Sequence, residues 1–266
     1  MTSSQTPENP TTGSRIWLTG ASYGLGRALA VELARGGAFL GLTARREDLL
    51  AEVLSEVEAA GGQGMVLPGD VTDRAAMNEA AQALRDRVGG IDMLVANAGS
   101  HVPTDVNAFD VDQYMGLMNL NFTGALNCID AVLPDMLKAG AGHIVGMASL
   151  AGFRGVPTAA AYGASKAALI HFLESMRFDV ESRGVKVTVV NPGFVRTPLT
   201  DKNTFRMPFL MEPDKAARVI RRGLERGRLE ITFPFPFSTY IKLLRILPMR
   251  LYVSIMRKTW DRMKPD

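Results

Sequence analysis

The sequence has little of what disulfide-bonded folds and metal centres require. Its 266 residues include one cysteine, Cys128, which excludes an intramolecular disulfide and a metal cluster held by cysteines. Cys128 lies in an apolar helical stretch, so we expect it in the core. The three histidines, His101, His143 and His171, have no partners for metal binding. We therefore expect no metal site and interpret all three histidines as structural or surface residues.

Long apolar runs and a secretory signal are also missing. No apolar run reaches the roughly 18 residues of a membrane span. The chain does not begin with the charged, apolar and small-residue pattern of a signal segment. Residues 1–14 are polar and contain Pro7, Pro10 and Gly13, so we expect a disordered leader and a cytoplasmic protein.

The formal net charge of +3 is unevenly distributed along the chain. Residues 211–266 hold 13 Lys and Arg against 6 Asp and Glu, whereas residues 1–210 hold 17 against 21. Because the excess positive charge is confined to the C-terminal region, we do not expect nucleic acid as a partner. The 47% share of hydrophobic residues provides ample material for a core.

Short apolar segments alternate with helical segments from residue 15 onward. Strands are predicted at 15–19, 38–43, 64–68, 91–96, 143–148, 185–190 and 228–233. Helices are predicted between them, at 27–35, 47–60, 73–88, 110–139 and 214–227, with a further helix that begins near Tyr162. This alternation is typical of βαβ units and predicts an α/β fold with a parallel sheet.

A glycine-rich turn follows the first strand directly. Gly20, Gly24 and Gly26 occupy the passage from strand to helix, where a backbone must turn sharply and approach a ligand without a Cβ in the way. The N-terminus of the following helix offers free N–H groups to a phosphate. The turn therefore indicates dinucleotide binding, although an ordinary βα turn would have the same composition.

Two arginines follow the second strand. Dinucleotide-binding folds place a carboxylate near this position to hold the ribose 2′-OH, while an arginine accommodates a 2′-phosphate. Here Arg45 and Arg46 precede the first carboxylate, Glu47, which favours NADP over NAD. The alternative is that both arginines belong to a solvated helix start.

Polar residues come at the ends of several predicted strands. Asp70, Asn97 and Ser149 each follow a strand, and the segment from Asn191 to Thr197 follows another. Ligands of parallel sheets bind outside the carboxyl ends of the strands. We therefore expect these residues to gather at one site.

Tyr162 and Lys166 are four residues apart on a predicted helix and so share one face. A phenol has a pKa of about 10, and a nearby cation favours the phenolate and lowers that value. A tyrosine tuned in this way can donate or accept a proton near neutrality. Such a pair also occurs by chance on many helices, so its meaning depends on the residues around it.

Together, these motifs resemble the short-chain dehydrogenase/reductase family over residues 15 to about 200. The matching segments, in order, are Thr19-Gly20-x-x-x-Gly24-x-Gly26, Asp70, Asn97-Ala98-Gly99, Asn121, Ser149, Tyr162-x-x-x-Lys166 and Pro192-Gly193. The resemblance implies a single-domain, Rossmann-type doubly wound parallel sheet with helices on both faces, here residues 15–235. It also implies a nicotinamide cofactor.

The resemblance further implies a catalytic tetrad of Asn121, Ser149, Tyr162 and Lys166. Ser149 would orient the substrate carbonyl, and Tyr162 would exchange a proton with the substrate oxygen. Lys166 would lower the pKa of Tyr162 and bind the nicotinamide ribose. Asn121 would support a water molecule next to Lys166, with Asn119 as the alternative two residues away.

The family pattern also implies which residues bind the cofactor. Glycines and neighbours of the first turn would hold the pyrophosphate, Asp70 the adenine, and Arg45 the 2′-phosphate. The expected cofactor-binding residues are Gly20, Ser22, Gly24, Leu25, Gly26, Arg45, Asp70, Val71, Asn97, Tyr162, Lys166, Pro192, Gly193 and Thr197. Many NADP-dependent relatives carry Arg or Lys at the position of Tyr23, so one of the two usual phosphate-binding cations is absent here. The preference for NADP over NAD therefore depends on Arg45.

Two C-terminal segments are expected to determine the substrate. The segment 198–213, here called the flap, is rich in Met and aromatic residues and would suit a hydrophobic carbonyl compound. The extension 236–266 is basic and amphipathic, and Pro248 divides it into two helices. Residues 239–260 could contact a membrane surface, cover the substrate pocket or pack on a neighbouring subunit of a homodimer or homotetramer.

The sequence thus predicts an NADP-dependent oxidoreductase that acts on a carbonyl or secondary alcohol, with a lipophilic substrate. A 3-oxoacyl-carrier-protein reductase is an alternative. A non-catalytic NADP-binding sensor or scaffold is a second alternative, which the intact tetrad disfavours. The expected location is the cytoplasm, with the inner face of a membrane as an option.

Overall fold

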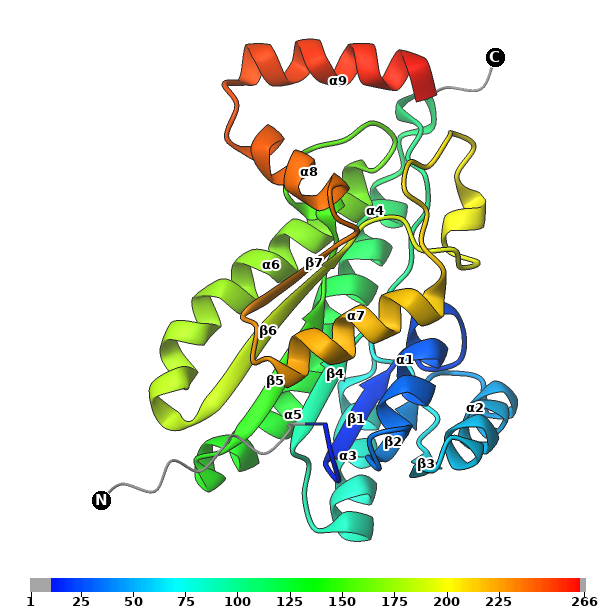
Figure 1. The fold of residues 1–266 in the computed structure, drawn as a ribbon, viewed down its shortest axis with the longest axis vertical. Helices are drawn as coiled ribbons and strands as arrows, with labels where there is room; N and C mark the ends of the chain where they lie inside the picture. Colours follow the sequence, from blue (N-terminus) through cyan, green and yellow to red (C-terminus); the bar gives the residue numbers. More distant parts are fainter. Residues whose placement is uncertain (1–10, 264–266) are drawn as a thin grey trace.

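The computed structural model describes residues 11–263, which form one parallel sheet covered by helices (Figure 1). Its seven strands are β1 (Arg15–Thr19), β2 (Phe39–Thr43), β3 (Gln63–Val66), β4 (Met93–Ala96), β5 (Gly142–Met147), β6 (Val185–Pro192) and β7 (Glu230–Phe233). Their spatial order is β3-β2-β1-β4-β5-β6-β7, and every pairing is parallel. The predicted doubly wound α/β fold is confirmed.

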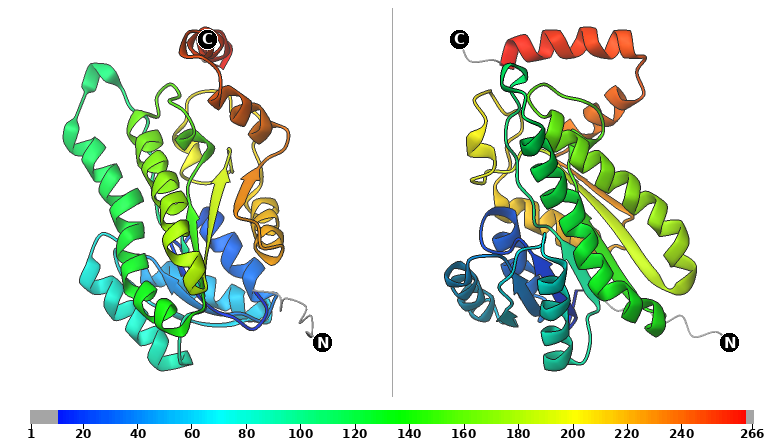
Figure 2. Two further views of the ribbon diagram at one scale, coloured as in Figure 1. Left: turned by 90° about the vertical axis from the view of Figure 1, so that its left-hand side faces the viewer. Right: turned by 180° about the vertical axis from the view of Figure 1, so that it is seen from behind.

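Helices cover both faces of this sheet (Figure 2). One face packs against α1 (Gly24–Ala34), α2 (Glu47–Ala59) and α7 (Pro213–Glu225). The other packs against α3 (Arg74–Val88), α5 (Gly124–Ala139) and α6 (Ala160–Val180). Strand β1 serves both cores, because Ile16 and Leu18 point to one face and Trp17 to the other.

The helix predicted at 110–139 is interrupted. It consists of α4 (Val111–Met118), a π-helical turn η2 (Asn119–Thr123) and α5. The turn holds Asn121, which is fully buried and hydrogen-bonded to neighbouring segments. One extra residue in the turn aims this side chain inward, a use of π turns that recurs at functional sites.

The predicted disordered leader falls mostly outside the described residues, which begin at Thr11. Thr11 is buried, and the Gly13 N–H donates to the Gly36 carbonyl over 3.3 Å. The described part of this segment therefore packs on the turn between α1 and β2.

The last two helices lie beyond the end of the sheet at which the strands finish (Figures 1 and 2). They are α8 (Phe237–Arg245) and α9 (Met249–Met263), and Pro248 separates them as predicted. Phe237 and Ile241 of α8 pack against the core on the α6 face of the sheet. The extension is therefore part of the folded structure.

Arg154 connects both helices to the loop after β5. Its Nη1 atom donates to the carbonyls of Leu244 and Leu247, each over 2.7 Å, at the C-terminal end of α8. Its guanidinium carbon lies 4.0 Å from the ring centroid of Tyr252 in α9. Tyr252 in turn donates its hydroxyl to the Gly155 carbonyl. Arg154 thus satisfies helix-end carbonyls that lack partners within the helix and stacks on an aromatic ring.

Replacing Arg154 with Met should loosen α8 and α9 while leaving the sheet intact. Loss of charge-assisted hydrogen bonds should lower the free energy of local opening by about 1–2 kcal/mol. Hydrogen exchange followed by mass spectrometry should show faster exchange in residues 237–263 and unchanged exchange in α6. Arg257→Met, an exposed change on α9, is the matched control. Equal exchange in Arg154→Met and wild type would contradict this role.

Candidate functional site

The glycine-rich turn is shaped so that no side chain could replace two of its glycines. A Cβ at Gly26 would lie 2.0 Å from the Gly20 carbonyl oxygen, and a Cβ at Gly20 would lie 2.7 Å from the Ala98 Cα. Gly20 also has a positive φ of 67°. The backbone therefore crosses the ends of β1 and β4 closely and presents the N-terminus of α1. This cradle fits the pyrophosphate of a dinucleotide.

Asn97 holds this turn in place. Its Nδ2 atom donates to the carbonyls of Thr19 and Gly20, each over 3.0 Å. The backbone N–H groups of Asn97 and Ala98 both donate to the Thr19 hydroxyl over 3.2 Å. Asn97, which was predicted to bind the cofactor, lines the cavity, but its side-chain amide donors are used to fix the turn.

The predicted 2′-phosphate residue lies at the end of β2. Arg45 is largely exposed, lines the cavity and comes within 3.9 Å of Asp70. Arg46 is engaged by Asp48, with its Nη2 at 2.6 Å from the carboxylate. Arg45 is therefore the arginine with the weaker existing ion pair.

Asp70 lies across from Arg45 at the end of β3. Its Oδ1 accepts hydrogen bonds from the backbone N–H and the hydroxyl of Thr72, over 2.9 and 2.8 Å. Those bonds, chiefly the backbone one, lower the pKa of Asp70 with help from Arg45. The carboxylate is thus ionised and oriented. Val71 lines the cavity next to it, and its carbonyl accepts from Asn127 over 2.8 Å.

The same cavity is also lined by five residues predicted to bind the cofactor, namely Ser22, Leu25, Pro192, Gly193 and Thr197. Thr197 packs on the glycine turn, since a Cβ at Gly24 would meet its methyl group at 2.9 Å. The segment after β6 therefore reaches back to the start of α1.

Asn121 ties the loop after β4 to helix α6. Its Oδ1 accepts from the Ser100 N–H over 2.8 Å, and its Nδ2 donates to the Ser100 carbonyl and the Ser165 hydroxyl over 3.0 and 2.9 Å. Asn119 is exposed. Of the two candidate asparagines, Asn121 is the one at the site, and its side chain positions the segments around Lys166.

Ser149 is brought to Tyr162 by close backbone packing. Ser149 caps the short helical turn η3 (Leu150–Gly152), with its Oγ accepting from the Ala151 N–H over 3.1 Å. This turn lies directly against α6, because a Cβ at Gly152 would be 2.8 Å from the Lys166 carbonyl carbon. The Ser149 hydroxyl donates to the Pro192 carbonyl over 3.5 Å, and its interaction with the nearby phenol lowers the pKa of Tyr162.

The pKa of Tyr162 is raised in this structure, whereas Lys166 was expected to lower it, and Lys166 is not among the causes of the shift. Burial raises the pKa of Tyr162 by more than the interaction with Ser149 lowers it. The Lys166 Nζ lies 5.9 Å from the Tyr162 ring centroid and donates to the Met147 carbonyl over 2.8 Å. Burial lowers the pKa of Lys166 itself to about 8. The phenol is therefore neutral and carries its proton.

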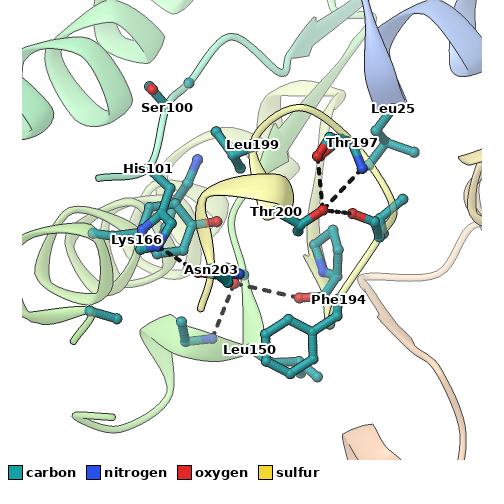
Figure 3. A pocket seen from close by; sticks show the side chains of 18 of the residues that line it. Leu25, Ser100, His101, Leu150, Lys166, Phe194, Thr197, Leu199, Thr200 and Asn203 are labelled. Carbon is teal, nitrogen blue, oxygen red and sulfur yellow. Dashed lines mark hydrogen bonds between the residues drawn. The ribbon is translucent and has the colours of Figure 1, made fainter. Parts of the chain in front are cut away.

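All the predicted site residues except Asn121 line one cavity of about 980 Å³ (Figure 3). The picture shows His101, Lys166 and Asn203 on one side and Leu25, Thr197 and Thr200 on the other. The flap contributes apolar side chains, among them Leu199, Phe205 and Phe209. Hydrogen bonds between Met211 and both Phe194 and Arg196 close the flap at its base.

His101 is a site residue that the sequence did not reveal. We expected a structural or surface histidine, but His101 lines the cavity with its ring 4.9 Å from that of Tyr162. Its Nε2 lies 3.2 Å from the Asn203 Oδ1, and its carbonyl accepts from Lys202. Asn203 Oδ1 can only accept, so Nε2 is the donor. The available signal was the position of His101, two residues after the Asn97-Ala98-Gly99 segment.

The inner faces of α8 and α9 also line the cavity. Phe237, Ile241 and Leu244 of α8 and Met256 and Trp260 of α9 contribute. Three hypotheses were given for this extension: contact with a membrane surface, contact with a neighbouring subunit, and cover of the substrate pocket. The structure supports the third. Contact with a membrane surface or a neighbouring subunit stays a prediction. No helix in residues 11–263 has the length and apolar character needed to cross a membrane.

Comparison with known proteins agrees with this geometry. A family model described as short chain dehydrogenase matches residues 14–207. An uncharacterized oxidoreductase of Myxococcus xanthus is 42% identical over 241 residues, which cover 91% of this chain and 95% of that protein. The ketoacyl reductase HetN of a Nostoc species is 34% identical over 224 residues, covering 83% of this chain and 78% of that protein.

The match to a further relative covers less of this chain. An uncharacterized oxidoreductase of Staphylococcus epidermidis is 35% identical over 188 residues, covering 71% of this chain and 80% of that protein. The extent of these matches, together with the sheet order and the glycine turn, identifies the family. The chain belongs to the short chain dehydrogenase family of oxidoreductases, which use nicotinamide dinucleotide cofactors.

Proposed function

We propose that the protein is an NADP-dependent oxidoreductase that interconverts a lipophilic carbonyl compound and its alcohol. The observation that carries the proposal is the neighbouring pair of Ser149 and Tyr162 hydroxyls in a cavity whose far wall is largely apolar. Two hydroxyls that converge in this way can bind one carbonyl oxygen. The flap and helices α8 and α9 provide the apolar surface for the rest of the substrate.

Tyr162 is proposed as the acid and base, and Ser149 as the residue that orients the substrate. A neutral Tyr162 holds the proton that a developing alkoxide takes up during reduction. The Ser149 hydroxyl hydrogen-bonds the same oxygen and fixes its position. When bound, a nicotinamide cofactor supplies or accepts the hydride.

Lys166 is proposed to stabilise the phenolate that remains after proton transfer. With a pKa of about 8, its ammonium group is mostly charged at neutral pH. A charge at this distance from the ring, in a buried setting, lowers the energy of an anion on Tyr162 without ionising the resting phenol. The expected contact of Lys166 with the nicotinamide ribose remains part of the proposal.

Cofactor preference is assigned to Arg45. The glycine cradle accounts for the pyrophosphate and Asp70 for the adenine, so the exposed guanidinium of Arg45 is available for a 2′-phosphate. Arginine binds phosphate through paired N–H donors and carries its charge at all working pH values. This supports NADP rather than NAD.

A ketoacyl substrate is the second candidate, because a relative bears the name ketoacyl reductase. The apolar lining from Phe205, Phe237 and Trp260 suits an acyl chain. A sensor without turnover is disfavoured by the assembled Ser149 and Tyr162 pair.

Tyr162→Phe should abolish turnover while leaving cofactor affinity nearly unchanged. Loss of a positioned acid or base costs about 10²–10⁴-fold in rate, and the cradle is untouched. The assay is NADPH oxidation with ketones and aldehydes graded by hydrophobicity, beside NADPH binding by calorimetry. Tyr114→Phe, on α4 and outside the cavity lining, is the matched control. Full activity in Tyr162→Phe would remove the proposed acid.

Arg45→Asp should reverse the cofactor preference. Removal of a charge-assisted contact with the 2′-phosphate, and addition of a carboxylate in its place, should change the NADPH to NADH affinity ratio by about 10²-fold. Arg46→Asp, at the neighbouring position already engaged by Asp48, should change it much less. An unchanged ratio in Arg45→Asp would refute the assignment.

A further inference from the structure

Two arginines line the same cavity at the end remote from the cofactor cradle. They are Arg206 of the flap and Arg262 in the last turn of α9. Both are exposed, and no ion pair is found for either one within residues 11–263. Their backbones are adjacent, since the Arg206 N–H donates to the carbonyl of Met263 over 3.1 Å.

The course of the flap places this pair relative to the reacting groups. Thr197, at its start, touches the glycine turn that holds the pyrophosphate. Asn203 then bonds His101, whose ring packs on Tyr162. Arg206 comes next and meets the end of α9. The segment therefore runs from the cofactor cradle, past the catalytic tyrosine, to the arginine pair.

Aromatic side chains adjoin the two arginines in this part of the cavity. Phe205 packs on Trp260 with ring centroids 5.3 Å apart, and on Phe194 with centroids 5.9 Å apart. Met256 of α9 lines the same region. A ligand that extends from the hydroxyl pair toward the arginines thus crosses aromatic and aliphatic surface before it meets charge.

Stabilisation of helix α9 explains the position of only one of the two arginines. A cation in the last turn of a helix interacts favourably with the helix dipole, which would explain Arg262. Arg206 lies in a loop, where this reason does not apply. The nearest acidic residues in sequence, Asp201 and Asp261, are not among the residues that line the cavity.

We propose that Arg206 and Arg262 form a subsite for the anionic end of the substrate. The substrate class is then a long apolar carbonyl compound with a carboxylate or similar anion at the end away from the carbonyl. Guanidinium groups pair with such anions through two parallel hydrogen bonds. The inference rests on the proposed function, since it deepens the choice of substrate for the same site.

The test compares two substrates that differ in one charge. An ω-oxo fatty acid carries an aldehyde at one end and a carboxylate at the other, and its methyl ester is neutral. For chains long enough to reach the arginines, the acid should have a kcat/KM about tenfold above that of the ester, mainly through KM. The advantage should shrink at high ionic strength, because exposed charges are screened. Equal kcat/KM values for acid and ester at every chain length would overturn the inference.

The double variant Arg206→Gln, Arg262→Gln should remove the advantage of the acid and leave the ester unaffected. Arg257→Gln is the matched control, because Arg257 is an exposed arginine of α9 that does not line the cavity. An equal loss in the control would attribute the effect to the general positive field of the extension and would also overturn the inference.

Binding without turnover separates this inference from the proposed function. Trp260 lines the cavity near Arg262, and the other tryptophan, Trp17, is buried in the core. Quenching of Trp260 fluorescence by a saturated fatty acid, against its methyl ester, reports the subsite whether or not any aldehyde is reduced. Tighter binding of the acid, lost in the double variant, supports the subsite even if turnover fails. Equal binding of acid and ester refutes it.

Discussion

The buried amide of Asn121 is the constraint on which the arrangement of the site depends. Its Nδ2 donates to the Ser100 carbonyl and the Ser165 hydroxyl, and its Oδ1 accepts from the Ser100 N–H. These bonds join the loop after β4 to the helix that carries Tyr162 and Lys166. A buried amide that lost these partners would carry a large desolvation penalty. The π turn at 119–123 is the local distortion that lets the side chain reach both partners. The same three hydrogen bonds thus fix the loop after β4 against the helix that carries the candidate residues Tyr162 and Lys166.

Close backbone packing at glycines brings the other parts of the site together. Gly152 allows the turn after β5 to lie against α6, which brings Ser149 beside Tyr162. Gly26 and Gly20 allow the first turn to cross the end of β4 in the same manner. Each contact joins elements that are distant in sequence at the carboxyl edge of the sheet. Close backbone contacts at these glycines are therefore as important for the assembly of the site as the contacts between side chains.

The sequence predicted the sheet, and every predicted site residue except Asn121 lines the cavity, because buried strands, βα turns and the positions at strand ends follow local patterns. The π turn was missed, since α-helix and π turn share one apolar pattern and differ by tertiary hydrogen bonds. His101 was misread because its partner, Asn203, is 102 residues away. The amphipathic pattern of 237–263 predicted two helices but not what their apolar faces cover, which the contacts of Arg154 decide.

Helices α8 and α9 have a consequence for how this enzyme type can diverge. The family match ends at residue 207, whereas Ile241, Leu244, Met256 and Trp260, which enclose the far part of the cavity, lie beyond it. The residues proposed for proton transfer and cofactor binding thus lie in one continuous stretch, and much of the proposed substrate wall lies in another. Because Arg154 holds this second stretch mainly through the backbone carbonyls of Leu244 and Leu247 and the ring of Tyr252, the side chains that face the cavity can change without loss of these contacts. Relatives with the same chemistry can therefore acquire new substrates by replacing one terminal segment.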